Sequence, residues 1–168
     1  RERIDEMEDP EIAINRALET YLKKGYSENW VNQRLKSIEI RKGLTDEWER
    51  GGIQKGLEFA ILTDEITKAW TGLTTKEYKQ LKGLKKENLR DNLTNMELVL
   101  NMLAEASTTE ISQAQNPKGL TQHKKVARAG GEVANKARKE LENQTGKKVI
   151  TSKNAKHLHK QIENIEEE

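Results

Sequence analysis

Apolar residues recur every three to four positions along most of the chain, which is the spacing of one face of an α-helix. Pro10 suits the first turn of a helix, and the apolar face that follows it over residues 14–22 ends at Gly25. Ser27 is a candidate N-cap for a second helix, whose apolar face runs to about Gly43. The pattern predicts two helices in the first quarter of the chain.

The next helical stretch contains a glycine pair. Thr45, followed by two acidic residues, predicts a helix start, because carboxylates stabilise a first turn. Gly51 and Gly52 predict a break, since each glycine inside a helix costs about 1 kcal/mol relative to alanine. The apolar stripe resumes over residues 53–73, so we expect a further helix that ends near Gly72.

Two capping boxes mark helix starts in the middle of the chain, each with Thr at the N-cap and Glu three residues later. The two pairs are Thr74 with Glu77 and Thr94 with Glu97. The first predicts a short helix that stops at Gly83, and residues 84–93 resemble a second short helix. The other opens a helix with a broad apolar surface over residues 96–103, around which we expect the other helices to pack.

The helical pattern thins after Pro117. One narrow stripe of mostly small residues spans 126–141 and is interrupted by Gly130 and Gly131. Such a helix buries little apolar surface, so it should dock weakly, pair with another chain, or order only on binding. We therefore expect the packed core to end near Ile111.

Composition supports an all-α fold with a thin core. Of the 168 residues, 35% are charged and 33% apolar, two are proline and none is cysteine. The absence of cysteine excludes disulfides, thiolate metal sites and cysteine nucleophiles. We expect an irregular multi-helix domain over residues 1–115, and a basic helical extension over residues 116–168 that ends in an acidic segment.

Charge is distributed unevenly behind a net value of only +2. Residues 1–75 carry −3, residues 76–117 are neutral, residues 118–160 carry +9, and residues 161–168 carry −4. A basic block of this kind is typical of a protein that binds a polyanion, and also of a solvated helix.

Enzymatic motifs are weak. Residues 145–148 do not complete a phosphate-loop motif, because the leading glycine is missing, and a helix C-cap at Gly146 explains them better. His157 and His159 lie two residues apart, a spacing that points their side chains to different sides of a helix. The adjacent acids Asp64 and Glu65 fit a solvated face. We expect no catalytic residue, no cofactor and no metal site.

No run of about 18 apolar residues exists that would span a membrane. We expect no membrane partner and a cytoplasmic location. The chain begins at Arg1 rather than Met, so we expect it to be a processed or excised fragment.

Nucleic-acid binding has more support than catalysis. The two short helices expected around Gly83 have the size of a helix-turn-helix unit, although a helical hairpin with a solvated lysine face fits equally well. Trp30, Trp48 and Trp70 are expected to anchor the core rather than to stack on bases. The candidate nucleic-acid contacts are Lys79, Lys82, Lys85, Lys86, Arg90, Lys124, Lys125, Arg128, Lys136, Arg138 and Lys139.

Specific strings resemble a known family. The string Lys82–Asn92, followed by residues 94–98, is similar to the C-terminal region of the DNA-damage-inducible protein D (DinD) and Bro-N family. Residues 35–48, 60–63, 103–111 and 129–138 resemble the same group, so the resemblance covers about residues 4–154. It implies a bacterial or prophage regulatory protein of the DNA-damage response rather than an enzyme. Family members typically carry an N-terminal Bro-N domain, associated with DNA binding and phage antirepressors, which we expect to be missing here.

Two functions stay open. The first is a regulatory, antirepressor-like module that acts with single- or double-stranded DNA through its basic helical surface. The alternative is a protein-interaction or oligomerisation module, with DNA contact left to the missing N-terminal domain. The family resemblance implies a recombinase or a repressor as the protein partner, and residues 121–145 are the candidate surface for a homo-oligomer.

Overall fold

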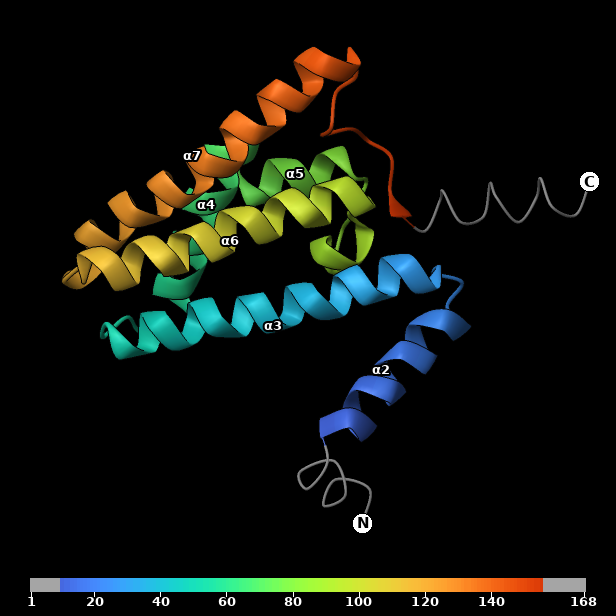
Figure 1. Cartoon of the computed structure of the whole chain (residues 1–168), viewed down its shortest axis with the longest axis horizontal. Helices are drawn as coiled ribbons and strands as arrows, with labels where there is room; N and C mark the ends of the chain where they lie inside the picture. Colours follow the sequence, from blue (N-terminus) through green and yellow to red (C-terminus); the bar gives the residue numbers. More distant parts are fainter. Residues whose placement is uncertain (1–9, 156–168) are drawn as a thin grey trace, which may run out of the picture.

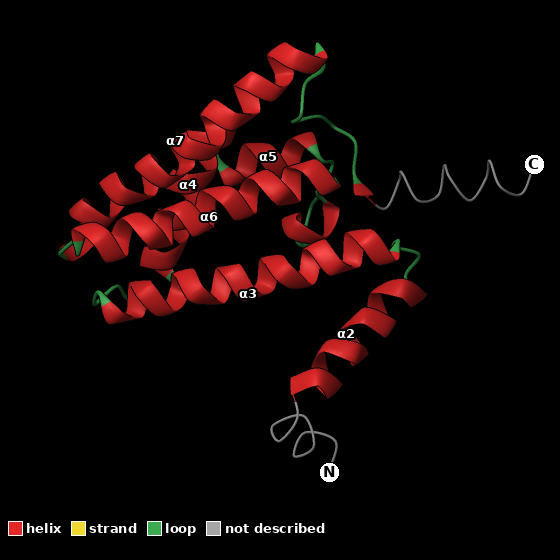
Figure 2. Cartoon of the chain, viewed as in Figure 1, coloured by secondary structure: helices red, strands yellow, loops and turns green. Residues whose placement is uncertain are grey.

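A computed structural model describes residues 10–155, and within this range every regular element is a helix (Figures 1 and 2). The predicted all-α fold is confirmed for this part of the chain. The elements are α2 (Pro10–Lys23), α3 (Glu28–Arg50), α4 (Leu57–Thr71), α5 (Thr75–Leu81), the 3₁₀ helix η1 (Leu89–Asn92), α6 (Asn95–Gln115) and α7 (Gly119–Thr145). His157 and His159 lie outside the described residues.

Helix α6 lies in the middle of the molecule. It packs against α3 on one side and α7 on the other, and it also contacts α4 (Figure 1). Helix α2 packs against α3. Trp48 and Trp70 are fully buried and Trp30 is 4% exposed, which confirms that the tryptophans anchor the core. As predicted, α3 and α7 pack against the segment that follows Thr94, but α4 packs mainly on α7, and Met96, Val99 and Leu103 of the predicted apolar surface stay exposed.

The local signals for helix starts and stops are mostly correct. Both capping boxes form, and the Ser27 hydroxyl accepts a hydrogen bond from the Trp30 N–H at the start of α3. Gly72 ends α4 with a φ of 80°, a conformation that favours glycine because it has no Cβ. The expected break at Gly51 is the end of α3.

Helix α3 does not stop near Gly43, so the predicted pair of helices around this residue is wrong. The helix continues to Arg50, and Thr45 donates a hydrogen bond back to the Lys42 carbonyl instead of capping a new start. Leu44 and Trp48 are fully buried on its inner face. Burying each contributes about 1.5–3 kcal/mol, which outweighs the helix penalty of one glycine.

The helix predicted over residues 84–93 is also wrong, since only η1 forms there. The Glu87 carboxylate accepts hydrogen bonds from the backbone N–H groups of Lys85 and Lys86, and the Asn88 side chain accepts one from the Arg90 N–H. Side chains that bind nearby backbone groups compete with helical hydrogen bonds. The segment is therefore a turn, and the helix-turn-helix interpretation loses its second helix.

Helix α7 is part of the core, contrary to the weak docking that its small residues predicted. A Cβ on Gly130 would lie 1.9 Å from the Thr108 Oγ1 atom of α6, and one on Gly131 would lie 2.5 Å from the Ala69 Cβ atom of α4. The glycine pair thus brings three helices into close contact. Its neighbours Ala127 and Ala134 are fully buried.

The chain returns to the core after α7. Val149 and Ile150 pack against the core cluster, and Ala155 is buried within it. The expectation that the core ends near Ile111 is wrong, because small residues bury effectively where backbones approach closely. The proposed division between residues 1–115 and 116–168 stays a prediction.

Candidate nucleic-acid interface

The Lys82–Asn92 string folds as a loop that is tied to the first two helices. The Asp91 carboxylate accepts hydrogen bonds from Arg34 Nε and from the Tyr21 hydroxyl, each at 2.9 Å. The Tyr26 hydroxyl donates to the Asp91 backbone carbonyl, also at 2.9 Å. The loop therefore has a fixed position relative to α2 and α3.

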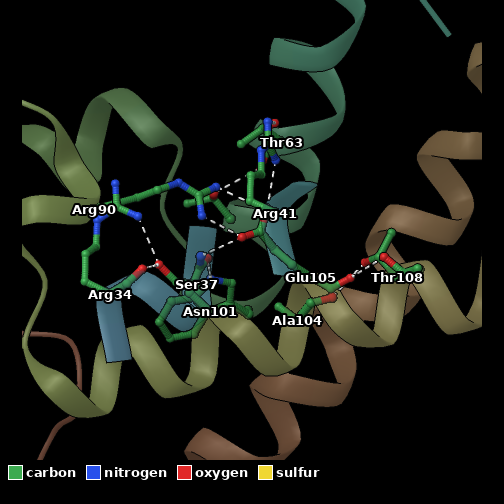
Figure 3. A network of polar contacts seen from close by, with 12 residues as sticks. Arg34, Ser37, Arg41, Thr63, Arg90, Asn101, Ala104, Glu105 and Thr108 are labelled. Atoms are coloured by element: carbon green, nitrogen blue, oxygen red, sulfur yellow. Dashed lines mark hydrogen bonds and ion pairs between the residues drawn. The ribbon is translucent and has the colours of Figure 1, made fainter. Parts of the chain in front are cut away.

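A buried carboxylate holds the same loop against α6. Glu105 accepts two hydrogen bonds from Arg90, at 2.6 and 3.1 Å, and one from Arg41 at 2.9 Å (Figure 3). Asn101 adds a further donor at 3.0 Å. Burial favours the neutral acid, but the attraction and hydrogen bonds of the two arginines prevail and hold the Glu105 pKa below its usual value. The arginines thus compensate a buried negative charge.

Lys82 belongs to a second buried group. Its side chain is completely buried, and its Nζ atom donates to Glu97 and to the Lys153 carbonyl. The Tyr78 hydroxyl donates to the same Glu97 carboxylate. Burial lowers the Lys82 pKa, while the Glu97 charge acts against this change. A lysine in this position cannot reach a phosphate group without breaking the core.

The structure divides the predicted contact residues into two sets. Four are paired with acidic residues of the chain, and their charges are partly neutralised. These pairs are Lys82–Glu97, Arg90–Glu105, Arg128–Glu65 and Arg138–Glu142. The others make no ion pair within residues 10–155: Lys79, Lys85, Lys86, Lys124, Lys125, Lys136 and Lys139.

Three surface hollows have Thr75 in their lining, and we call the three together the Thr75 groove. Their volumes are about 400, 650 and 420 Å³. The basic residues that line the groove are Arg41, Lys76, Lys79, Lys85, Lys86 and Arg90.

Two acidic residues also line the groove, but the carboxylates of both accept hydrogen bonds from backbone N–H groups. Asp64 accepts a hydrogen bond from the Thr75 N–H at 2.7 Å, and Glu87 holds the turn at Lys85 and Lys86. Neither is ion-paired with a groove lysine within the described range. The groove therefore carries an excess of positive charge that is open to solvent.

The groove gathers only part of the predicted set. Lys79, Lys85, Lys86 and Arg90 line it, whereas the candidates on α7 do not. Arg128 lines a separate hollow between α4 and α7, together with Lys68 and two acidic residues.

Two further basic residues of the groove, Lys76 and Arg41, are not among the contacts predicted from the sequence. Lys76 lies three positions before Lys79 in α5, so helical spacing places both on one side and could have indicated it. Arg41 has no local signal, because α3 approaches the groove only through tertiary packing.

Gly146 has the role expected for residues 145–148. It is the C-cap of α7, and its N–H donates to the Glu142 carbonyl.

Within residues 10–155, no three His, Asp or Glu residues lie close enough together to hold a metal ion. None of the helices described there is long and apolar enough to cross a membrane.

The chain matches a known family model. The model described as the DinD C-terminal domain matches residues 29–165, which is most of the chain and includes the whole Thr75 groove. No curated protein matches the chain.

Proposed function

The chain belongs to the DinD C-terminal domain family, and from this premise we propose that it is a regulatory module that binds DNA through the Thr75 groove. The resemblance expected from the Lys82–Asn92 string is confirmed, and the family is that of a DNA-damage-inducible protein. The proposed module is non-enzymatic and cytoplasmic. It serves the DNA-damage response or an antirepressor-like control in a bacterium or prophage.

The observation that carries the proposal is a set of lysines in one groove without ion-pair partners among the described residues: Lys76, Lys79, Lys85 and Lys86. Each lysine that neutralises a DNA phosphate releases condensed counterions, which favours binding at low salt. Paired basic residues contribute less, because they must first give up an internal partner.

The support beneath these lysines also favours binding. Two ion pairs, Arg34–Asp91 and Arg90–Glu105, join the loop to α3 and α6. The backbone that carries Lys85 and Lys86 is therefore ordered before any ligand binds. A preorganised surface loses less conformational entropy on binding than a mobile one. The groove offers several cations but few neutral hydrogen-bond donors for base edges, so binding should show little sequence preference.

A salt series on charge variants tests the proposal. Lys79→Gln/Lys86→Gln should weaken DNA binding and reduce the slope of log affinity against log salt by about 2, because two phosphate contacts are lost. Fluorescence anisotropy with labelled single- and double-stranded oligonucleotides measures both quantities.

The matched control removes the same charge from α3. Lys36→Gln/Lys42→Gln acts on exposed lysines that pair with Glu39 and Asp46, and it should change the salt slope much less. Lys136→Gln/Lys139→Gln tests the α7 surface separately. Equal losses in all three variants, or no binding by the folded protein at about 50 mM salt, would contradict the groove as the DNA site.

One observation favours the alternative function as well. Met96, Val99 and Leu103 form a stripe on α6 and are 42%, 37% and 37% exposed. A stripe of exposed large apolar residues is a feature of interaction surfaces. In this second proposal the domain binds a recombinase, a repressor or another copy of itself, and an N-terminal domain contacts DNA. The mass of the protein in solution tests self-association.

A further inference from the structure

The first hollow of the Thr75 groove is lined by charged and by apolar side chains. Lys79, Lys86 and Arg90 are basic and outnumber the one acidic residue, Glu87, while Leu89 and Leu93 provide an apolar wall. Its volume of about 400 Å³ lies within the range of small-molecule sites in proteins. A lone phosphate group would fill only a small part of this space, so the charge and the volume together suit a larger anion.

We propose that this hollow holds one nucleoside monophosphate unit, with its phosphate between Lys79 and Lys86 and its base against the apolar wall. The inference rests on the proposed function, since it names the part of DNA that the groove takes up. It adds that the unit is bound as phosphate, sugar and base together, rather than through its backbone charge alone.

The charges in the hollow assign the phosphate to the lysines. Arg90 directs two of its donor groups to Glu105, and this ion pair offsets much of its charge. Lys79 and Lys86 form no ion pair within the described residues, so their ammonium groups are free to meet an anion. The Arg90–Glu105 ion pair instead holds the Arg90 side of the hollow in a fixed position.

The polar groups of the hollow predict weak discrimination between bases. Asn101 is already used, because it accepts from Trp70 Nε1 and donates to Glu105. The Asn88 oxygen accepts from the Arg90 N–H, which leaves the Asn88 amide NH₂ group and the Thr75 hydroxyl as available donors. Two such donors beside an apolar wall select poorly among four bases. We expect the four deoxynucleoside monophosphates to bind within about tenfold of one another.

Titrations of the 168-residue chain with small probes test the assignment. The probes are 2′-deoxyadenosine 5′-monophosphate, the unphosphorylated nucleoside, and inorganic phosphate, followed by NMR of backbone amides. The monophosphate should shift the signals of residues that line the hollow and should bind at least tenfold more tightly than either fragment. It should also compete with an oligonucleotide for the protein.

A filling variant separates volume from charge. Thr75→Leu adds bulk at the residue that lines all three hollows, removes one hydroxyl and changes no charge, and it should weaken monophosphate binding at least fivefold. Thr20→Leu on the exposed surface of α2 is the matched control and should have no effect. If Thr75→Leu fails to fold by circular dichroism, the competition with the intact protein decides instead.

The outcomes distinguish this inference from the proposed function. Loss of DNA binding in Lys79→Gln/Lys86→Gln, without any monophosphate binding to the intact protein, would overturn the nucleotide site and leave DNA binding in place. Monophosphate binding without DNA binding would support the site and refute the proposed function. Equal affinity for phosphate and monophosphate would overturn the inference, because the volume would then have no role.

Discussion

Two lysines one helical turn apart show how a partner decides the role of a residue. Lys79 lines the groove and has no ion-pair partner in the described range, whereas Lys82 is enclosed with Glu97 and Tyr78. Removing one member of a buried ion pair commonly costs about 3–5 kcal/mol, because the other charge is left unpaired. Lys82 therefore serves stability and Lys79 is available for binding, although the sequence presents both as members of one basic run.

His123 is a buried residue with an unusual environment. It is 1% exposed, and neither ring nitrogen has a hydrogen-bond partner within the described part of the chain. Glu47 and Arg50 of α3 and Glu58 of α4 are the charged groups that influence it. Burial lowers the His123 pKa below its ordinary value of 6.5, and the Glu47 carboxylate opposes this change less strongly.

The lowered pKa predicts a loss of stability in mild acid. At pH values between the folded and the unfolded pKa of His123, the unfolded chain binds more protons than the folded protein. His123 therefore does not reduce stability above about pH 6.5, and it lowers the free energy of unfolding as the pH falls below this value. His123→Leu should remove this part of the pH dependence and raise stability at pH 7.5 by about 1 kcal/mol, because two unpaired polar atoms leave the core. Urea unfolding between pH 5 and 8 measures both effects.

His123→Gln provides the contrast for this prediction. It removes the titrating ring but keeps polar atoms buried, so it should lose the pH dependence without gaining stability at pH 7.5. An unchanged pH profile in both variants would show that His123 does not titrate differently in the folded state.

At the scale of elements, α7 shows what small residues contribute. Its sequence offers few large apolar side chains, yet Gly130 and Gly131 bring its backbone against Thr108 of α6 and the α4 residue Ala69. Close backbone approach replaces side-chain volume as the source of packing contacts. In the pattern of large apolar residues, this glycine pair looks like an interruption of the helix. The pattern cannot detect a helix that packs closely because it has no side chain at these two positions.

Alanine substitutions test this role of the glycine pair. Gly130→Ala and Gly131→Ala should each lower the free energy of unfolding by about 3 kcal/mol or more, because the added Cβ atoms would overlap neighbouring atoms. Gly43→Ala is the matched control, since it lies inside α3 with no atom within 4 Å of the added Cβ. It should raise stability by about 1 kcal/mol through helix propensity. Urea denaturation that ranked all three variants alike would refute the close packing of α7.

At the scale of the whole molecule, the exposed α6 stripe bears on self-association. Light scattering over a range of concentrations should give the mass of one chain, 19.3 kDa, if the α6 stripe does not mediate self-association. A dimer in solution that Leu103→Lys converts to a monomer would favour the interaction module instead. Leu57→Lys is the control, because Leu57 is a large apolar residue at the start of α4 and is 75% exposed.

The sequence by itself determined the helical elements whose signals are local. Capping boxes at Thr74 and Thr94, the N-cap Ser27 and the break at Gly51 depend on neighbours within a few residues, so they were predicted correctly. The family was also recognised at this level, because the strings that carry the resemblance are continuous in the chain, and the family model matches residues 29–165.

Only the tertiary structure decided which basic residues are available. Arg90 and Lys82 are neutralised by Glu105 and Glu97, which lie fifteen residues further along the chain, and Arg41 reaches the groove from a different helix. The same limit applied to α7, whose fit depends on residues of two other helices. Ion pairing and close packing depend on distances between segments, and the order of residues along one chain does not contain those distances.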